Sequence, residues 1–197
     1  MKNNQQKKRC AGCGDEVPSY DGVHLTAGDT HRFLCSECYN RNTAEAFGFD
    51  FEHLSFQPVT LEDRDGEEHA FHFQTRLLGD LIYIQALEIK EGEPKGYKFA
   101  QSGYAEDDLF GLFTKLVERL TREMERKHIE ADHFLPYSIT GDDIVRGRVS
   151  WDEETGGEVP LLVIDGKELS WHEFGRMLMT YEGFHFKLEI FDETEER

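Results

Sequence analysis

The chain has 197 residues, with 22 Lys or Arg against 40 Asp or Glu, so its formal net charge is −18. This acidic excess argues against a large nucleic-acid-binding surface, because affinity for polyphosphate depends on basic groups that displace counterions. Hydrophobic residues at 38% and aromatic residues at 12% supply enough apolar side chains for a packed core, which argues against wholesale disorder. The length suggests one main domain with a small additional module.

Residues 1–9 form a basic tail in which no apolar stretch follows the charges, so nothing resembles a secretory signal. The longest apolar runs, 81–84 and 161–164, are far shorter than the roughly 20 residues of a membrane-spanning helix. We therefore expect a cytoplasmic protein without membrane contact. In that compartment thiols stay reduced, and grouped cysteines are expected to bind metal rather than form disulfides.

The four cysteines form two Cys-x2-Cys pairs, separated by a spacer of 21 residues. The predicted metal ligands are Cys10, Cys13, Cys35 and Cys38. Two such pairs complete a tetrahedral thiolate site, so the module 10–48 is predicted to bind one structural Zn²⁺. Iron with the same ligands is an alternative, whereas a redox dithiol would need a single pair near a βαβ unit. Because four thiolates fill the tetrahedron, we expect His24 and His31 to be surface residues.

The spacer contains two short extended pieces, 23–25 and 31–34, around a turn at 27–29. Residues 39–47 can form a helix that ends at Gly48. The order knuckle, hairpin, knuckle and helix is that of a treble-clef finger. A zinc ribbon, in which a strand follows the second knuckle, is the alternative. Gly12 and Gly14 flank Cys13, where a tight knuckle favours residues without a Cβ.

The predicted fold class is α+β, in which the finger precedes a mostly antiparallel sheet packed with one long and one shorter helix. The sheet belongs to an acidic domain at 49–191. Strict alternation makes 69–77 a half-buried strand, and 81–89 is apolar on both faces near its start, as in an inner strand. Short turns join these strands to 59–61 and 97–100, which predicts an antiparallel meander.

An apolar stripe with helical spacing predicts the long helix at 105–129. Ser170 and Glu173 match a capping box that opens the shorter helix, which ends before Gly183. Further strands are predicted at 144–151, at 161–164 and, from the alternation of Phe184, Phe186, Leu188 and Ile190, at 184–190. Residues 192–197 are a charged tail.

Standard catalytic motifs are absent: the sequence has no phosphate loop, Gly-x-Gly-x-x-Gly, Gly-x-Ser-x-Gly or His-Glu-x-x-His. His69 and His72 lie three residues apart on a strand, so their rings should point to opposite faces. His128 and His133 are interpreted as the polar end of the long helix. We therefore predict no catalytic and no cofactor-binding residues beyond the zinc ligands.

Several other groups favour ordinary structural roles. The acidic pairs and triplets at 142–143 and 152–154 do not match a calcium loop and are interpreted as solvated turns. Trp151 and Trp171 stand in apolar patterns, which predicts that both pack in the core or against a sheet.

Four segments resemble known proteins. They are Cys-x2-Cys-Gly with the second Cys-x2-Cys, Leu77-Leu78-Gly79-Asp80, Glu106-Asp107-Asp108-Leu109-Phe110, and the stretch 171–186. Together they resemble bacterial proteins of unknown function that combine an N-terminal four-cysteine zinc finger with a C-terminal α+β domain. The resemblance implies zinc at the four cysteines and carries no activity or catalytic residue.

Three classes of function follow. We expect a zinc-binding protein whose acidic domain contacts a protein partner or a small ligand. The alternatives are an enzyme with a non-standard active site and a nucleic-acid-associated factor that uses the finger and the basic tail. Residues 1–45 carry six basic and six acidic groups, so the whole acidic excess lies in the remainder. Nucleic-acid binding is therefore expected to be weak and confined to the N-terminal module.

Overall fold

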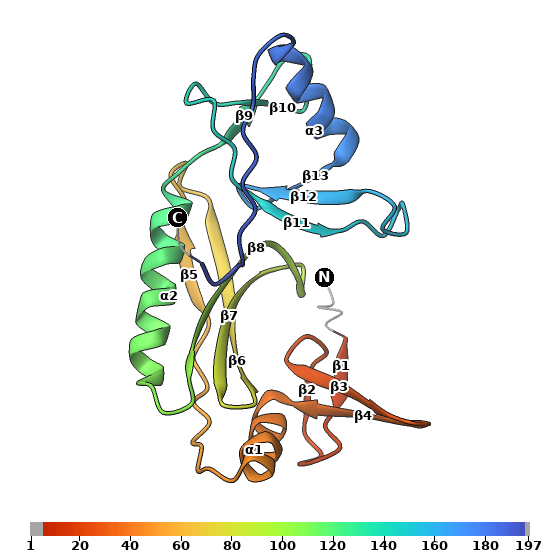
Figure 1. Cartoon of the computed structure of the whole chain (residues 1–197), viewed down its shortest axis with the longest axis vertical. Helices are drawn as coiled ribbons and strands as arrows, with labels where there is room; N and C mark the ends of the chain where they lie inside the picture. Colours follow the sequence, from red (N-terminus) through yellow and green to blue (C-terminus); the bar gives the residue numbers. More distant parts are fainter. Residues whose placement is uncertain (1–5, 196–197) are drawn as a thin grey trace.

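The computed structural model describes residues 6–195, so the predicted tails at 1–9 and 192–197 lie partly outside the described residues. Every strand pair in the described chain is antiparallel, and helices are few, which confirms the α+β class with mostly antiparallel sheets. Figure 1 shows three parts in succession along the long axis: a small N-terminal part, a central sheet with its helix, and a C-terminal part.

The N-terminal part consists of two hairpins and a helix. Its elements are β1 (Lys7–Arg9), β2 (Glu16–Pro18), β3 (Gly22–Ala27), β4 (Thr30–Cys35) and α1 (Ser36–Phe47). The hairpin in the spacer and the helix after it are confirmed, although α1 begins at Ser36 rather than at residue 39. It ends as predicted at Gly48, whose φ of 77° is the left-handed conformation that glycine adopts without strain. The tail prediction is wrong for Lys7–Arg9, which pair with β2 as a strand.

The central sheet is the predicted meander. Its strands, in spatial order, are β5 (Val59–Glu62), β6 (Glu68–Leu78), β7 (Leu81–Lys90) and β8 (Glu93–Tyr104). β7 is an inner strand, as its apolar pattern predicted. β8 is longer than the predicted 97–100 because it follows β7 along most of that strand, with one irregularity in register.

One face of the sheet packs against α2 (Leu109–Met124) to form the main core. Phe71, Ile84, Leu116 and Leu120 are fully buried there. The helix is shorter than the predicted 105–129. Asp108 caps its first turn by accepting a hydrogen bond from the Phe110 amide, and strand β9 begins at residue 129. No helix among the described residues is both long and apolar enough to span a membrane.

The other face of the sheet is polar and still largely covered. Gln74 and Gln85 are buried on it. The Gln74 side-chain amide donates to the Tyr20 carbonyl of the N-terminal part, whereas Gln85 donates to the Glu193 carboxylate at 3.3 Å. Both ends of the chain therefore meet on this face, which explains why its residues are hydrophilic.

The C-terminal part has its own hydrophobic cluster, centred on Ile129, Ile164, Leu169 and Met177. Its elements are β9 (Ile129–Ala131), β10 (Tyr137–Ile139), β11 (Arg148–Trp151), β12 (Pro160–Ile164), β13 (Lys167–Ser170), α3 (Trp171–Leu178) and the 3-10 helix η1 (Met179–Tyr181). Only the last four residues of the predicted strand at 144–151 form a strand, β11. The sequence did not predict β9, β10 or β13. These strands are too short to show a periodicity.

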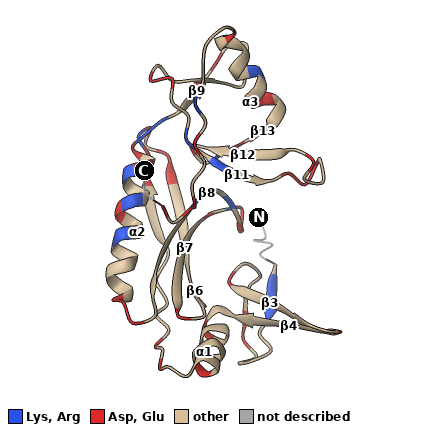
Figure 2. Cartoon of the chain, in the orientation of Figure 1, with Lys and Arg blue, Asp and Glu red and all other residues tan. Residues whose placement is uncertain are grey.

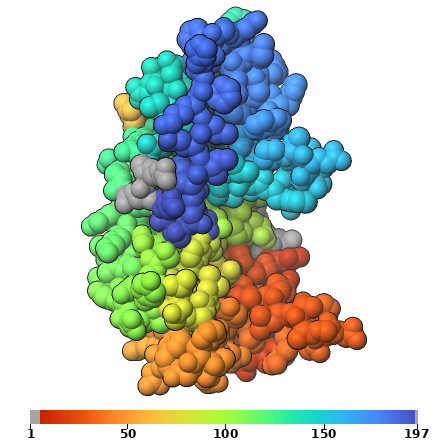
Figure 3. Space-filling model, in the orientation of Figure 1, coloured from red at the N-terminus to blue at the C-terminus, as the bar shows by residue number. Residues whose placement is uncertain are grey.

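The predicted strand at 184–190 is wrong. The segment has no strand partner among the described residues, and its four alternating apolar side chains are 73–89% exposed. It connects η1 to residues 192–195, where the Glu193 carboxylate accepts from Gln85 on the polar face of the sheet at 3.3 Å. The Glu193 carbonyl oxygen accepts from the Arg119 guanidinium of α2 at 2.9 Å. No strand of the described chain pairs with the segment, so its alternating pattern does not become a strand. Figure 3 shows the segment lying across the surface of the molecule.

Trp151 and Trp171 are also not core residues, since 66% and 48% of their surfaces are exposed. Trp151 ends the short strand β11, where its ring covers the backbone of Gly157 in the following turn. Acidic residues gather on this turn (Figure 2). One of them departs from the predicted solvated turn: Asp152 is buried and accepts a hydrogen bond from the Glu154 amide at 2.9 Å.

The capping box of α3 is confirmed and yields a stability prediction. The Ser170 hydroxyl accepts from the Glu173 amide, and the Glu173 carboxylate accepts from the Ser170 amide at 2.8 Å. Replacing Ser170 with Ala should lower the free energy of unfolding by about 1 kcal/mol, measured in urea. The exposed Ser55, which lies outside helices and strands, offers a matched control: S55A should change it by less than about 0.5 kcal/mol.

The same capping box should make the stability of the fold depend on pH. Hydrogen bonds from the Ser170 side chain and backbone lower the pKa of Glu173. A lowered folded-state pKa stabilises the fold above the ordinary carboxyl value, and this contribution is lost as the pH falls through the folded-state pKa. The S170A variant should therefore lose less stability than wild type on acidification, and equal losses in both proteins would contradict the assignment.

Candidate metal centre

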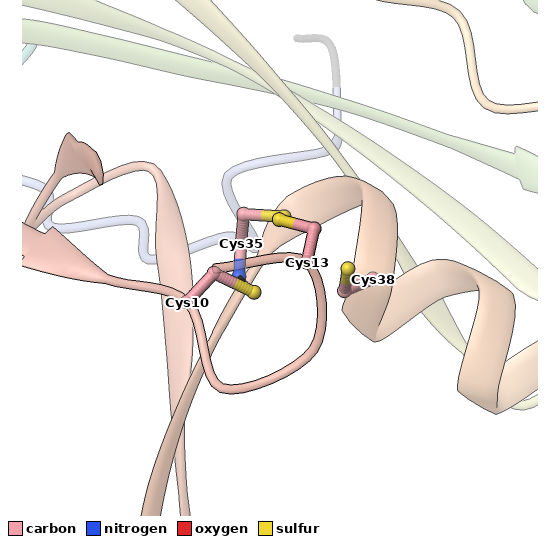
Figure 4. Close-up of side chains that lie close together, drawn as sticks. All are labelled: Cys10, Cys13, Cys35 and Cys38. Atoms are coloured by element: carbon pink, nitrogen blue, oxygen red, sulfur yellow. Dashed lines mark hydrogen bonds between the residues drawn. The ribbon is translucent and has the colours of Figure 1, made fainter. Parts of the chain in front are cut away.

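The four cysteines come from three separate elements and meet at one point. Cys10 follows β1, Cys13 lies in the turn before β2, Cys35 ends β4 and Cys38 lies in the first turn of α1. Their four Sγ atoms lie within 4.8 Å of one another (Figure 4). Three of the side chains are buried, and that of Cys13 is exposed.

The spacing suits a tetrahedral ion. Zn–S bonds of about 2.3 Å at tetrahedral angles place two sulfurs about 3.8 Å apart. The Sγ atoms of Cys13 and Cys35 are 3.9 Å apart, well beyond the length of a disulfide. All four cysteines are free thiols in the structure. The cluster is therefore compatible with a bound metal ion and not with a pair of disulfides as it stands.

Backbone amides surround one of the sulfurs. The amides of Gly12 and Cys35 both donate to Cys10 Sγ at 3.3 Å. Burial by itself would raise the pKa of the Cys10 thiol, but hydrogen bonds from Cys13, Cys35 and Gly12 outweigh it and lower the pKa to about 6. Burial raises the pKa of the Cys35 thiol to about 11. One thiolate is thus preformed near neutral pH, whereas others would lose their protons to a metal ion.

The two glycines of the first knuckle, Gly12 and Gly14, are each required for a different structural reason. A Cβ on Gly12 would stand 2.9 Å from Cys38 Sγ, so a side chain there would push into the cluster. Gly14 has a φ of 86°, which residues other than glycine rarely adopt. Arg41, one turn further along α1, donates from Nη2 to Cys38 Sγ at 3.2 Å and offsets negative charge at the sulfurs.

Helix α1 connects the cysteine cluster to the central sheet through Asn40, which is fully buried. Its Nδ2 donates to the Thr75 carbonyl at 2.7 Å, and its Oδ1 accepts from the Leu77 amide at 2.8 Å. Strand β5 pairs only with residues 68–71 of β6, so these two backbone groups lie on an edge that β5 leaves uncovered. Asn40 therefore takes the place of a neighbouring strand.

The spacer histidines lie outside the cluster, as predicted. His24 Nε2 is 3.0 Å from Lys8 Nζ, and His31 Nδ1 is 3.1 Å from Thr26 Oγ1. Neither ring belongs to the group of side chains that could share an ion with the cysteines.

The other histidines are dispersed. His69 and His72 point to opposite faces of β6: His69 contacts Glu88, whereas His72 lies 3.6 Å from Asp21 of the N-terminal part. His128 Nδ1 bonds to the Ile144 carbonyl at 2.9 Å, which agrees with a structural role near the end of α2. Neither of the two best-formed pockets in the described chain is lined by these rings.

A second cluster of possible ligands escaped the sequence analysis. Asp63, Glu67 and His69 each offer one ligand atom within 4.8 Å of the others, at the turn joining β5 to β6. The sequence showed only a charged turn followed by a strand, although the histidine two residues after Glu67 was a usable signal. The neighbour of His69 on β7, Glu88, could be found only from the strand register.

Comparison with known families divides the chain into three. A domain of unknown function (DUF7685) matches residues 9–50, a second (DUF7686) matches 52–125, and a third (DUF7713) matches 128–195. These segments largely correspond to the three hydrophobic clusters of the fold, although Ala44 and Phe49 of the first segment pack in the main core. The expected likeness to proteins of unknown function is thus supported, although none of the three descriptions mentions a zinc finger. No curated protein and no solved structure matches the chain.

Proposed function

We propose that this chain is a zinc-binding protein in which Cys10, Cys13, Cys35 and Cys38 hold one structural Zn²⁺. The observation that carries the proposal is the convergence of four free thiols at tetrahedral spacing. Reduced thiols fit a cytoplasmic location. Full-length protein should contain one equivalent of zinc by metal analysis, and Cys38→Ser should contain at most a small fraction of it. Metal-free wild-type protein would contradict the proposal.

The order of elements supports a finger of the treble-clef type. A knuckle precedes the hairpin β3–β4, and α1, rather than a strand, follows the second knuckle and supplies Cys38. A zinc ribbon would need a strand at that position. With four thiolates around the ion, no coordination site is left for water, so the metal would stabilise the fold rather than take part in catalysis.

We further propose that the apolar segment 184–191 binds a protein partner. Phe184, Phe186, Leu188 and Ile190 are exposed in a row, although burial of such side chains is worth about 1.5–3 kcal/mol each. The segment belongs to no helix or sheet in the described chain, so its backbone groups are open to the extended pairing by which peptides add a strand to another protein. The partner would therefore offer an open strand edge beside an apolar groove.

Site-specific crosslinking tests this proposal. A photoreactive amino acid in place of Phe186, introduced in the native cell, should form an adduct with one protein that can be identified and purified. Binding of that protein should weaken at least about 10-fold with Phe186→Ala, as for a buried aromatic at an interface, and change less than about 2-fold with the exposed control Glu182→Ala. Crosslinks to no protein, or only to a second copy of this chain, would contradict it.

A further inference from the structure

A buried histidine at the opposite end of the sheet from the cysteines is held in one orientation. His69 is 3% exposed, and its Nδ1 lies 2.6 Å from Glu88 Oε1. Glu88, which is 1% exposed, also accepts from the Tyr97 amide at 2.8 Å and pairs with Lys90 at 2.9 Å. Lys90 balances the charge of Glu88, so a neutral imidazole with its proton on Nδ1 would complete the hydrogen bonds of Glu88.

The other ring nitrogen has no such partner. His69 Nε2 is buried without a hydrogen-bond partner among the described residues, and it faces Asp63 Oδ2 at 3.5 Å. Asp63 is itself fixed, because its Oδ1 accepts from the amides of Asp65 and Glu67 at 2.9 and 2.8 Å. A nitrogen lone pair that faces a carboxylate oxygen is repelled by it unless a positive charge lies between them.

The spacing fits a metal ion in that position. Two ligands at about 2.1 Å from one ion, at tetrahedral angles, stand about 3.4 Å apart, close to the separation of Nε2 and Oδ2. The Glu67 carboxylate completes the set within 4.8 Å. The Glu88 contact matches the carboxylate that commonly orients a metal-binding histidine through its second nitrogen.

We propose that Asp63, Glu67 and His69 bind a divalent transition-metal ion, with Glu88 as the positioning residue. A cavity of about 130 Å³ between the sheet and the C-terminal part is lined by Asp63, Tyr97 and Asp165 among others, so it reaches the Asp63 carboxylate. The turn that carries the site lies beside the C-terminal end of α2, where Lys127 pairs with Asp65 (Figure 1). Imidazole and carboxylate ligands suit Zn²⁺ and Mn²⁺.

Titration calorimetry tests the site. Full-length protein is first loaded with Zn²⁺ and freed of excess metal, and Zn²⁺ is then titrated into it. Wild type should bind a further equivalent with micromolar affinity. Asp63→Asn, which keeps the acceptor for the turn amides, should weaken this event at least about 100-fold, and Glu67→Gln at least about 10-fold. Both Glu67 and Glu68 are exposed, so Glu68→Gln is a matched control that should change the affinity less than about 2-fold.

Mn²⁺ gives a second, independent readout, because this ion prefers oxygen and nitrogen ligands to thiolates. It should broaden the NMR signals of His69 and leave those of His24 unchanged. Calorimetry that shows no further equivalent at 1 mM Zn²⁺, or equal affinities of E67Q and wild type, would overturn the proposal. So would a His69 ring that carries protons on both nitrogens with and without metal, because an imidazolium between two carboxylates would then explain the geometry.

Discussion

Removing the proposed zinc ion from the cysteine cluster should unfold the N-terminal module while the main core keeps its secondary structure. The module has almost no core of its own: three of the four buried side chains in its hydrophobic cluster are Cys10, Cys35 and Cys38. Structural zinc binding is worth on the order of 10 kcal/mol, more than the whole stability of many domains. Chelation should therefore abolish amide protection in β3, β4 and α1, measured by hydrogen exchange.

Replacing single residues separates the ligands from their neighbours. Cys10→Ser and Cys38→Ser should each reproduce the effect of the chelator, because an ion with three thiolates binds far more weakly. His24→Ala and His31→Ala should keep one equivalent of metal and full protection, since both rings lie outside the cluster. Metal analysis also distinguishes zinc from iron. Unchanged exchange in α1 after complete loss of metal would show that the cluster has no role in stability.

The second large effect is expected from Asn40→Ala. This change leaves the Thr75 carbonyl and the Leu77 amide without partners on the edge of β6. A buried backbone group that loses its hydrogen bond costs about 1–3 kcal/mol, so the free energy of unfolding in urea should fall by about 2–5 kcal/mol. Amide exchange at Leu77 should accelerate in the folded state, which a general loss of packing would not predict.

Two further variants sharpen the assignment. Asn42→Ala removes the same side chain from an exposed position of α1 and should change stability by less than about 0.5 kcal/mol. Asn40→Asp keeps the acceptor for the Leu77 amide but cannot donate to the Thr75 carbonyl. Its free energy of unfolding should therefore lie between those of wild type and N40A, or below that of N40A. Burial lowers the pKa of His53, which leaves its Nδ1 free to accept from Asn40 at 3.0 Å. If N40A were as stable as N42A, the edge contact would have no energetic role.

Local sequence patterns predicted those helices and strands whose periodicity or capping residues lie within the element itself. The alternation of Phe71, Phe73 and Leu77 placed these side chains on the core face of β6, and the stripe along α2 placed Leu116 and Leu120 against them. The caps at Gly48 and Ser170 likewise depend on neighbours within a few residues. These predictions succeeded because period, turn chemistry and capping are local properties of the chain.

The segment 184–190 shows the limit of local patterns. Its alternation is typical of a strand, but a strand exists only where a second backbone pairs with it. This segment instead runs unpaired beside the C-terminal part (Figure 1). The predicted burial of Trp151 and Trp171 was wrong for a related reason, since apolar neighbours in the sequence do not decide which face another element covers. Burial is decided by packing between elements, which the sequence pattern of one element does not contain.

By itself the sequence determined that the four cysteines form one cluster, because two Cys-x2-Cys pairs can be recognised from spacing alone. It also determined the mostly antiparallel α+β class through its alternating segments and turns. Only the tertiary structure placed Asn40 on the edge of β6 and Glu88 against His69. Those contacts join residues 35 and 19 positions apart, and their formation depends on strand register and helix packing, which no single segment encodes.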